Sequence, residues 1–132
     1  MSEENVAIVR RIYAEGMLDR DPEELLKLAA DDIVYVNPPD AVEPGVRRGT
    51  EEVARAMRRF AEPWEESRHE LRELYDGGDA VVAEVWWHIR HAGSSSWLRN
   101  EEVHIWTVRD GRIAGFEWGL DLPKALEAAG LS

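Results

Sequence analysis

Three strand-length segments in the second half of the chain carry side chains that a plain hydrophobic core does not need. Taken at every second residue, the segments read Glu84, Trp86 and His88, then Glu102, His104 and Trp106, then Phe116 and Trp118. Residues two apart on a strand share one face of the sheet. A face that only packed would carry Val, Ile and Leu, so aromatic residues mixed with titratable ones predict the wall of a ligand pocket.

Short turn signals divide the same half of the chain. Gly77-Gly78, Gly93-Ser94-Ser95-Ser96 and Asp110-Gly111 are typical of tight connections between antiparallel strands. The segment before Gly77 also has helical propensity, but the Gly-Gly pair that follows it favours a hairpin. The expected strands cover residues 65–75, 80–91, 97–108 and 112–120.

The first half follows helical spacing instead. Asp21-Pro22 is a strong helix start, because aspartate caps well and proline suits the first helical position. Pro38 and Pro39 stop the one strand expected in this half, since proline cannot donate to a sheet ladder. The expected helices cover residues 4–18, 22–31, 50–63 and 123–129, and the strand covers residues 33–37. Helices and strands are therefore segregated, which predicts the α+β class.

Composition limits what kind of protein this is. A length of 132 residues predicts one domain, residues 1–132, and the absence of Cys excludes disulfides, thiolate metal sites and a cysteine nucleophile. The net charge of -11 opposes binding to nucleic acid. No apolar run reaches the roughly 18 residues of a membrane span, and the acidic N-terminus is no secretory signal. We expect a soluble, cytoplasmic protein without nucleic-acid or membrane partners.

Several short motifs occur in a specific order along nearly the whole chain. They are Asp19-Arg20-Asp21-Pro22 through Leu28-Ala29-Ala30-Asp31-Asp32, Gly49-Thr50-Glu51-Glu52-Val53, Gly78-Asp79-Ala80-Val81-Val82, Trp106-Thr107-Val108-Arg109-Asp110-Gly111-Arg112-Ile113 and Ala125-Leu126-Glu127-Ala128-Ala129-Gly130-Leu131. Their order resembles the nuclear transport factor 2-like superfamily, in its SnoaL-like and ketosteroid-isomerase-like branch. The resemblance implies a cystatin-like α+β cone, with three helices packed on a strongly curved, mostly antiparallel sheet around an internal pocket.

The resemblance also implies roles for three residues. Tyr13 matches an oxyanion-stabilising tyrosine, and Asn37, just before Pro38, falls where the isomerases have a base aspartate. His104 falls where they have a carboxylic acid kept neutral to donate a hydrogen bond, an effect for which ketosteroid isomerase is the known example. An amide cannot take a proton from carbon, so Asn37 argues against ketosteroid isomerisation. We expect His104 to act as acid or base, with Tyr13 and Asn37 holding a substrate oxygen.

The remaining candidates are expected to line the pocket and bind a small hydrophobic ligand. They are Met17, Tyr35, Trp64, Glu84, Trp86, His88, Glu102, Trp106, Phe116 and Trp118. Each has an alternative: the aromatic residues also suit a core, and Glu84 and Glu102 suit a rim or a structural ion pair. The assignment of Glu84, Trp86 and His88 depends on strand pairing, since a shift of one residue turns all three to the other face.

Two further expectations concern partners and metals. The alternate residues of the 80–91 strand, from Val81 to Ile89, are wholly apolar. We expect a second subunit to cover that face, which predicts a homodimer through the outer face of the sheet. The four His residues lack close ligand spacing, so no metal site is expected.

Two hypotheses of function remain. The first is a SnoaL-like enzyme that needs no cofactor and applies acid–base chemistry to a small hydrophobic carbonyl or hydroxyl compound, as a dehydratase, isomerase or cyclase. The second is a non-catalytic module of the same fold that binds a small ligand or dimerises. A shared fold does not decide between them.

Overall fold

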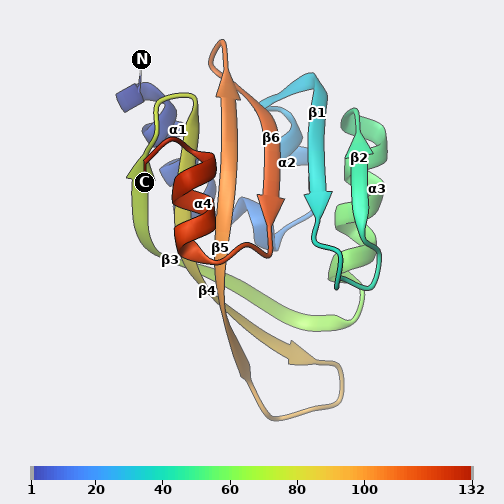
Figure 1. Cartoon of the computed structure of the whole chain (residues 1–132). Coiled ribbons are helices and arrows are strands. Elements are labelled where there is room, and N and C mark those ends of the chain that lie inside the picture. Colours follow the sequence, from blue (N-terminus) through green and yellow to red (C-terminus); the bar gives the residue numbers. More distant parts are fainter. Residues whose placement is uncertain (1, 132) are drawn as a thin grey trace.

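A six-stranded sheet forms the frame of the molecule, in the order β2-β1-β6-β5-β4-β3. The computed structural model describes residues 2–131. Its elements are α1 (Ser2–Ala14), the 3-10 turn η1 (Met17–Asp19), α2 (Glu23–Leu26), β1 (Ala29–Asn37), β2 (Gly45–Arg48), α3 (Thr50–Ala61), β3 (Trp64–Asp76), β4 (Ala80–His91), β5 (Leu98–Arg109), β6 (Arg112–Trp118) and α4 (Leu122–Ala128). Figure 1 shows α1, α2 and α3 on one side of this sheet and α4 on the other. The predicted α+β class and mostly antiparallel sheet are confirmed.

The four long strands follow the turn signals closely. β3 to β6 pair antiparallel in chain order, and the ambiguous segment before Gly77 is strand β3, as the hairpin argument predicts. β1 then pairs parallel with β6, which brings the two halves of the chain together. Asp121 caps α4 by accepting a hydrogen bond from the backbone N–H of Lys124 at 2.9 Å. Local turn and capping chemistry was therefore sufficient for this half.

The expected boundaries in the first half were partly wrong. α1 ends at Ala14, because Gly16 adopts a left-handed φ of 63° and the chain then forms the separate turn η1. α2 is only one turn long, and β1 begins at Ala29 rather than at residue 33. The segment Gly45–Arg48, for which no helix or strand was expected, is the edge strand β2 and pairs with β1. Pairing partners distant in sequence extend both strands beyond what local propensity indicates.

The register between β4 and β5 decides which residues face the helices. Ala83 pairs with His104, and Val85 pairs with Glu102. Directly paired residues share a face, so the odd residues of β4 lie on the face of His104. The prediction that Glu84, Trp86 and His88 line the pocket is wrong for this reason. They lie on the outer face, and Trp87 takes the inner position.

The apolar face of β4 is covered by the chain itself. Val81, Ala83 and Val85 lie in the main core, together with Val9 of α1 and Leu25 of α2. On the outer face, α4 covers a smaller cluster that includes Val82, Ile105, Ala125 and Ala129. The expected homodimer stays a prediction, and its sequence argument loses its premise, because the apolar residues of β4 need no second subunit.

The outer face of the sheet beyond α4 is charged. Trp86 lies there between two guanidinium groups, with Arg72 at 3.9 Å and Arg99 at 4.2 Å from the ring centre. His88 Nε2 lies 2.9 Å from a carboxylate oxygen of Glu70. Within residues 2–131, every helix is too short or too polar to cross a bilayer.

Candidate functional site

A cavity of about 410 Å³ lies between the inner face of the sheet and the segments around η1 and α3. Its wall is mainly aromatic and apolar, with several polar and charged side chains. The lining residues are Met17, Leu18, Asp19, Arg20, Asp21, Pro22, Tyr35, Met57, Arg58, Phe60, Ala61, Glu62, Trp64, Ser67, His69, Trp87, Glu102, His104, Phe116 and Trp118. The size and the mixture of aromatic walls with a few convergent polar groups are those of small-molecule sites.

His104 stands in a directed chain of hydrogen bonds. The Trp106 indole N–H donates to the Tyr13 hydroxyl oxygen at 2.8 Å, and that hydroxyl lies 2.6 Å from His104 Nδ1. Because Tyr13 already accepts from Trp106, its proton is best donated to Nδ1. Nε2 then carries the imidazole proton and donates it to Glu102 Oε1 at 2.9 Å. The chain fixes the orientation of His104 and favours the tautomer that carries the proton on Nε2.

This chain lies in a dry part of the molecule. His104 is only 1% exposed. Burial lowers the pKa of His104 below its usual value, although the hydrogen bond to Glu102 opposes the shift. Burial also raises the pKa of Tyr13 well above its usual value. The pair therefore consists of a neutral imidazole and a neutral phenol at neutral pH.

A second histidine, which the sequence argument missed, lies in the same cavity. His69 Nδ1 lies 2.7 Å from Asp19 Oδ1, and the His69 backbone N–H donates to Asp19 Oδ2 at 2.9 Å. Ser67 Oγ–H donates to Asp19 at 2.9 Å, and the Trp87 indole N–H donates to Ser67 at 2.9 Å. Burial raises the pKa of Asp19, but the bonds to His69 outweigh it and hold that pKa below its usual value. In the neutral ring, an ionised Asp19 keeps the proton of His69 on Nδ1 and leaves Nε2 as an acceptor.

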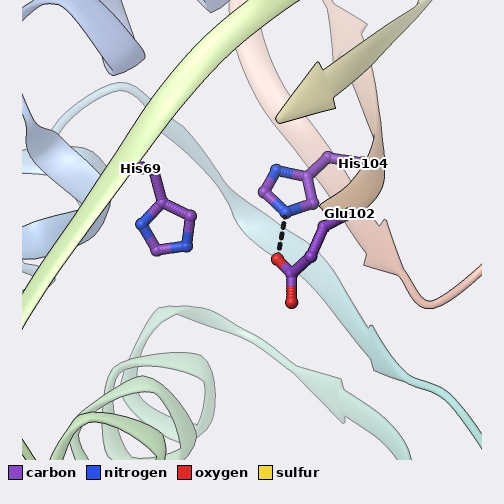
Figure 2. A group of neighbouring side chains, drawn as sticks. All are labelled: His69, Glu102 and His104. Atoms are coloured by element: carbon purple, nitrogen blue, oxygen red, sulfur yellow. Dashed lines mark hydrogen bonds and ion pairs between the residues drawn. The ribbon is translucent and has the colours of Figure 1, made fainter. Parts of the chain in front are cut away.

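The two histidines and Glu102 lie close together (Figure 2), and all three line the cavity. One donor atom from each of His69, Glu102 and His104 lies within 4.8 Å of the others. The His69 ring turns the edge that carries its second nitrogen toward Glu102 (Figure 2). The rings of His69 and His104 are 5.8 Å apart between centroids. The cluster therefore presents an acceptor nitrogen, a donor N–H and a carboxylate to the same space.

The structure places some of the predicted site residues in the cavity wall and others away from it. Met17, Tyr35, Trp64, Glu102, His104, Phe116 and Trp118 line the cavity. Trp106 is fully buried behind Tyr13, and neither residue is part of the cavity wall. Tyr13 contacts His104 rather than the cavity, because its hydroxyl group is hydrogen-bonded to both Trp106 and His104. Its predicted contact with a substrate oxygen is replaced by a contact that positions His104.

Asn37 also lies away from the cavity wall. Its side-chain N–H donates to the Glu43 carbonyl at 2.8 Å, and its Oδ1 accepts from the Trp118 indole N–H at 2.7 Å. Both ends of the amide are thus occupied, and Asn37 fixes Trp118 in the wall instead of meeting a ligand. The prediction that Asn37 holds a substrate oxygen is wrong on this geometry.

Trp64 differs from the other aromatic residues of the wall. Its indole Nε1 is buried and has no hydrogen-bond partner among the described residues. A buried donor left unpaired costs about 1–3 kcal/mol. A ligand oxygen within reach of this N–H would recover that energy.

Comparison with known proteins identifies the fold. The family model of the SnoaL-like domain matches residues 9–116. A structure described as a putative SnoaL-like polyketide cyclase from Jannaschia sp. superimposes with a TM-score of 0.77, at 16% identity, over 98% of this chain and 94% of that one. An NTF2-like protein of unknown function from Burkholderia pseudomallei gives a TM-score of 0.77 at 23% identity, over 94% and 95%.

A third solved structure carries a small ligand. It is a hypothetical protein with a ketosteroid isomerase-like fold from Catenulispora acidiphila, in complex with trimethylamine. It superimposes with a TM-score of 0.73 at 21% identity, over 95% of this chain and 93% of that one. Comparison with curated proteins gives no match. At these identities the likeness supports the fold, and the chemistry depends on the site.

Proposed function

The chain belongs to the SnoaL-like domain family, and we propose that it is an acid–base enzyme that removes a proton beside the carbonyl of a small hydrophobic hydroxy-carbonyl compound. The observation that carries this proposal is the Asp19–His69 pair: Asp19 lies against Nδ1 of His69, a residue that lines the aromatic-walled cavity, and the ring edge with the second nitrogen is turned toward Glu102 (Figure 2). A histidine held in this way is a suitable general base, because the carboxylate stabilises the imidazolium that forms.

The acid–base role expected of His104 moves to His69. His104 has its proton on Nε2 and is too deeply buried to charge easily, so it serves as a neutral donor. Turned from Glu102 to a carbonyl oxygen, the same N–H stabilises the negative charge that develops there. Tyr13 supports this role by holding the other nitrogen, at 2.6 Å.

The proposed step balances without a cofactor. The C–H bond beside the carbonyl breaks, its proton goes to His69 Nε2, and its electron pair forms an enolate whose oxygen accepts from His104. In a β-hydroxy ketone, the C–O bond then breaks, and the leaving oxygen takes the proton from His69 and departs as water. Dehydration is the outcome we favour, whereas return of the proton to another carbon would be isomerisation.

The wall of the cavity favours a flat apolar ligand. Phe60 stacks on Trp87 with ring centroids 5.1 Å apart, and Tyr35 stacks on Phe116 at 5.6 Å. Such faces bind rings and conjugated carbonyl compounds well. Trp64 adds an unpaired donor for a second oxygen.

The test has two stages. Hydrophobic hydroxy-ketones and phenols are first screened by thermal shift, because a ligand raises the melting temperature by mass action. Binders are then incubated in deuterated water, and exchange of the hydrogen beside the carbonyl is followed by NMR. We expect exchange with the native protein, and its loss in His69→Gln with affinity kept within about tenfold.

His88→Gln is the matched control, because His88 also pairs with a carboxylate, Glu70, at 2.9 Å but lies on the outer face. It should exchange at the native rate. Ligands that bind without exchange or turnover would support the non-catalytic binding module instead and would overturn the proposal.

A further inference from the structure

We propose that His69, Glu102 and His104 form a binding site for a divalent transition-metal ion of the zinc type. The inference concerns metal affinity and does not rest on the proposed reaction. It also reverses the expectation of no metal site, which rested on sequence spacing alone. The three residues come from β3 and β5, so their approach is a product of the curved sheet.

The donor set is the first argument. Two imidazoles and one carboxylate are a known catalytic zinc set, which leaves a fourth position open for water or a ligand. Their donor atoms already lie within 4.8 Å of one another, and His104 Nε2 and Glu102 Oε1 are 2.9 Å apart. In a tetrahedral site with Zn–N and Zn–O bonds of about 2.0–2.2 Å, neighbouring donor atoms lie about 3.4 Å apart, so His104 Nε2 and Glu102 Oε1 must separate slightly and any wider pair must close.

The groups behind the ligands are the second argument. Metal-binding histidines almost always donate their other ring N–H to a carboxylate, a carbonyl or water. Asp19 has this relation to His69, since it lies 2.7 Å from Nδ1. Tyr13 can accept the other ring N–H of His104 after a change of tautomer. In that tautomer Nδ1 carries the proton and donates it to the Tyr13 hydroxyl oxygen. That oxygen has a second lone pair, which continues to accept from Trp106.

Charge is the third argument. Asp19 and Glu102 both line the cavity, and their side chains are 14% and 13% exposed. Each carboxylate lies within hydrogen-bonding distance of a histidine of the cluster, at 2.7 Å for Asp19 and His69 and at 2.9 Å for Glu102 and His104. Two carboxylates with so little exposure make this place favourable for a bound cation.

The consequence for chemistry is specific. A metal ion on Nε2 of both histidines uses the lone pairs through which protons would be exchanged. We therefore expect zinc to inhibit the proposed proton transfer, while the open coordination position still faces the aromatic cavity. Magnesium and calcium prefer oxygen ligands and should bind far more weakly.

The experiment uses the full chain freed of metal by a chelator. Zinc binding is measured by calorimetry, and cobalt is added separately, because its visible absorption reports coordination geometry. We expect one zinc ion per chain with micromolar affinity or tighter, together with a cobalt band typical of four or five ligands. Native protein that binds neither ion would overturn the proposal.

Variants locate the ion. His69→Gln and Glu102→Gln should each lose zinc binding, and Asp19→Asn should weaken it by about 10–100-fold as a group behind a ligand. His88→Gln, which removes the outer His–Glu pair, should bind zinc as the native protein does. Circular dichroism checks that each variant folds. Equal binding in His69→Gln and native protein would assign the ion to another place and reject this site.

The two proposals fail separately. Proton exchange in the presence of chelator, without zinc binding, would keep the acid–base function and remove the metal site. Zinc binding without any exchange would do the reverse.

Discussion

Asp19 and His69 are 50 residues apart in the chain, and their side chains meet at 2.7 Å in the wall of the cavity. Asp19 also accepts from the His69 backbone and from Ser67, so one carboxylate joins η1 to β3. The pair therefore connects two elements of the fold and also forms part of the candidate site.

Removal of this carboxylate should destabilise the protein. Asp19→Ala leaves the donors of Ser67 and His69 without their acceptor, and hydrogen bonds to charged groups contribute about 1.5–3 kcal/mol. We expect urea unfolding at neutral pH to show a loss of this size. Asp21→Ala is the control, since its ion pair with Arg58 is exposed to solvent and should contribute little. Equal losses in the two variants would contradict the joining role of Asp19.

The register of β4 can be tested with two neighbouring tryptophans. Trp87 lines the cavity, whereas Trp86 lies on the outer face between Arg72 and Arg99. Trp87→Ala should weaken a ligand found by thermal-shift screening at least tenfold, and Trp86→Ala should leave its affinity within about twofold. The opposite order in a calorimetric titration would place the even residues of β4 inward.

The unpaired indole of Trp64 predicts a ligand contact. Trp64→Phe keeps most of the ring and removes the buried N–H, so the free protein should lose little stability. A ligand oxygen bound by that N–H should lose about 0.5–1.5 kcal/mol of affinity, or roughly two- to tenfold. Trp97→Phe, at an exposed position, is the control. Unchanged affinity for every oxygen-bearing ligand would remove Trp64 from recognition.

Gly119 is packed too closely to accept a side chain. A Cβ there would lie 2.5 Å from Pro38 Cγ, and the residue has a φ of 92°. Gly111 also has positive φ, at 75°, but a Cβ there would meet nothing within 4 Å. We expect Gly111→Ala to cost about 1–2 kcal/mol in thermal unfolding, and Gly119→Ala to cost clearly more. Similar melting temperatures for the two variants would exclude a steric role for Pro38.

Alkaline pH should destabilise the fold through tyrosine. Burial raises the pKa of Tyr35 to about 12, and the hydrogen bond to Glu84 raises the pKa of Tyr75 to about 12. A pKa raised in the folded state contributes stability that is complete below the unfolded value of about 10 and is lost as pH rises toward 12. For the buried Tyr35 the loss is about 2–3 kcal/mol.

The measurement is tyrosinate absorbance during a pH titration, with unfolding followed by circular dichroism. The chain has three Tyr residues, and burial raises the pKa of Tyr13 as well. We expect almost no tyrosinate at pH 10 while the protein is folded. A tyrosine that titrates normally would contradict the burial of Tyr13 and Tyr35 or the hydrogen bond between Tyr75 and Glu84. Glu84→Gln should return Tyr75 alone toward its usual pKa.

The sequence by itself determined the elements whose signals are local. Gly77-Gly78 and Asp110-Gly111 placed the hairpins, and Asp121 placed the start of α4. The motifs also sufficed for the family, and the alternation on β5 placed Glu102 and His104 on one face of the sheet, where both line the cavity. Such signals lie within a few residues of the structure that they determine, so a single sequence is enough to predict that structure.

Only the tertiary structure decided which side chains meet. The face of β4 depends on its pairing with β5, and a difference of one residue exchanged Trp86 for Trp87. Asp19 and His69 gave no local signal, because one lies in a turn and the other in a strand with helical propensity. Their contact, and the approach of His69 to Glu102 and His104, arise from the curvature of a sheet that joins residues far apart in the chain.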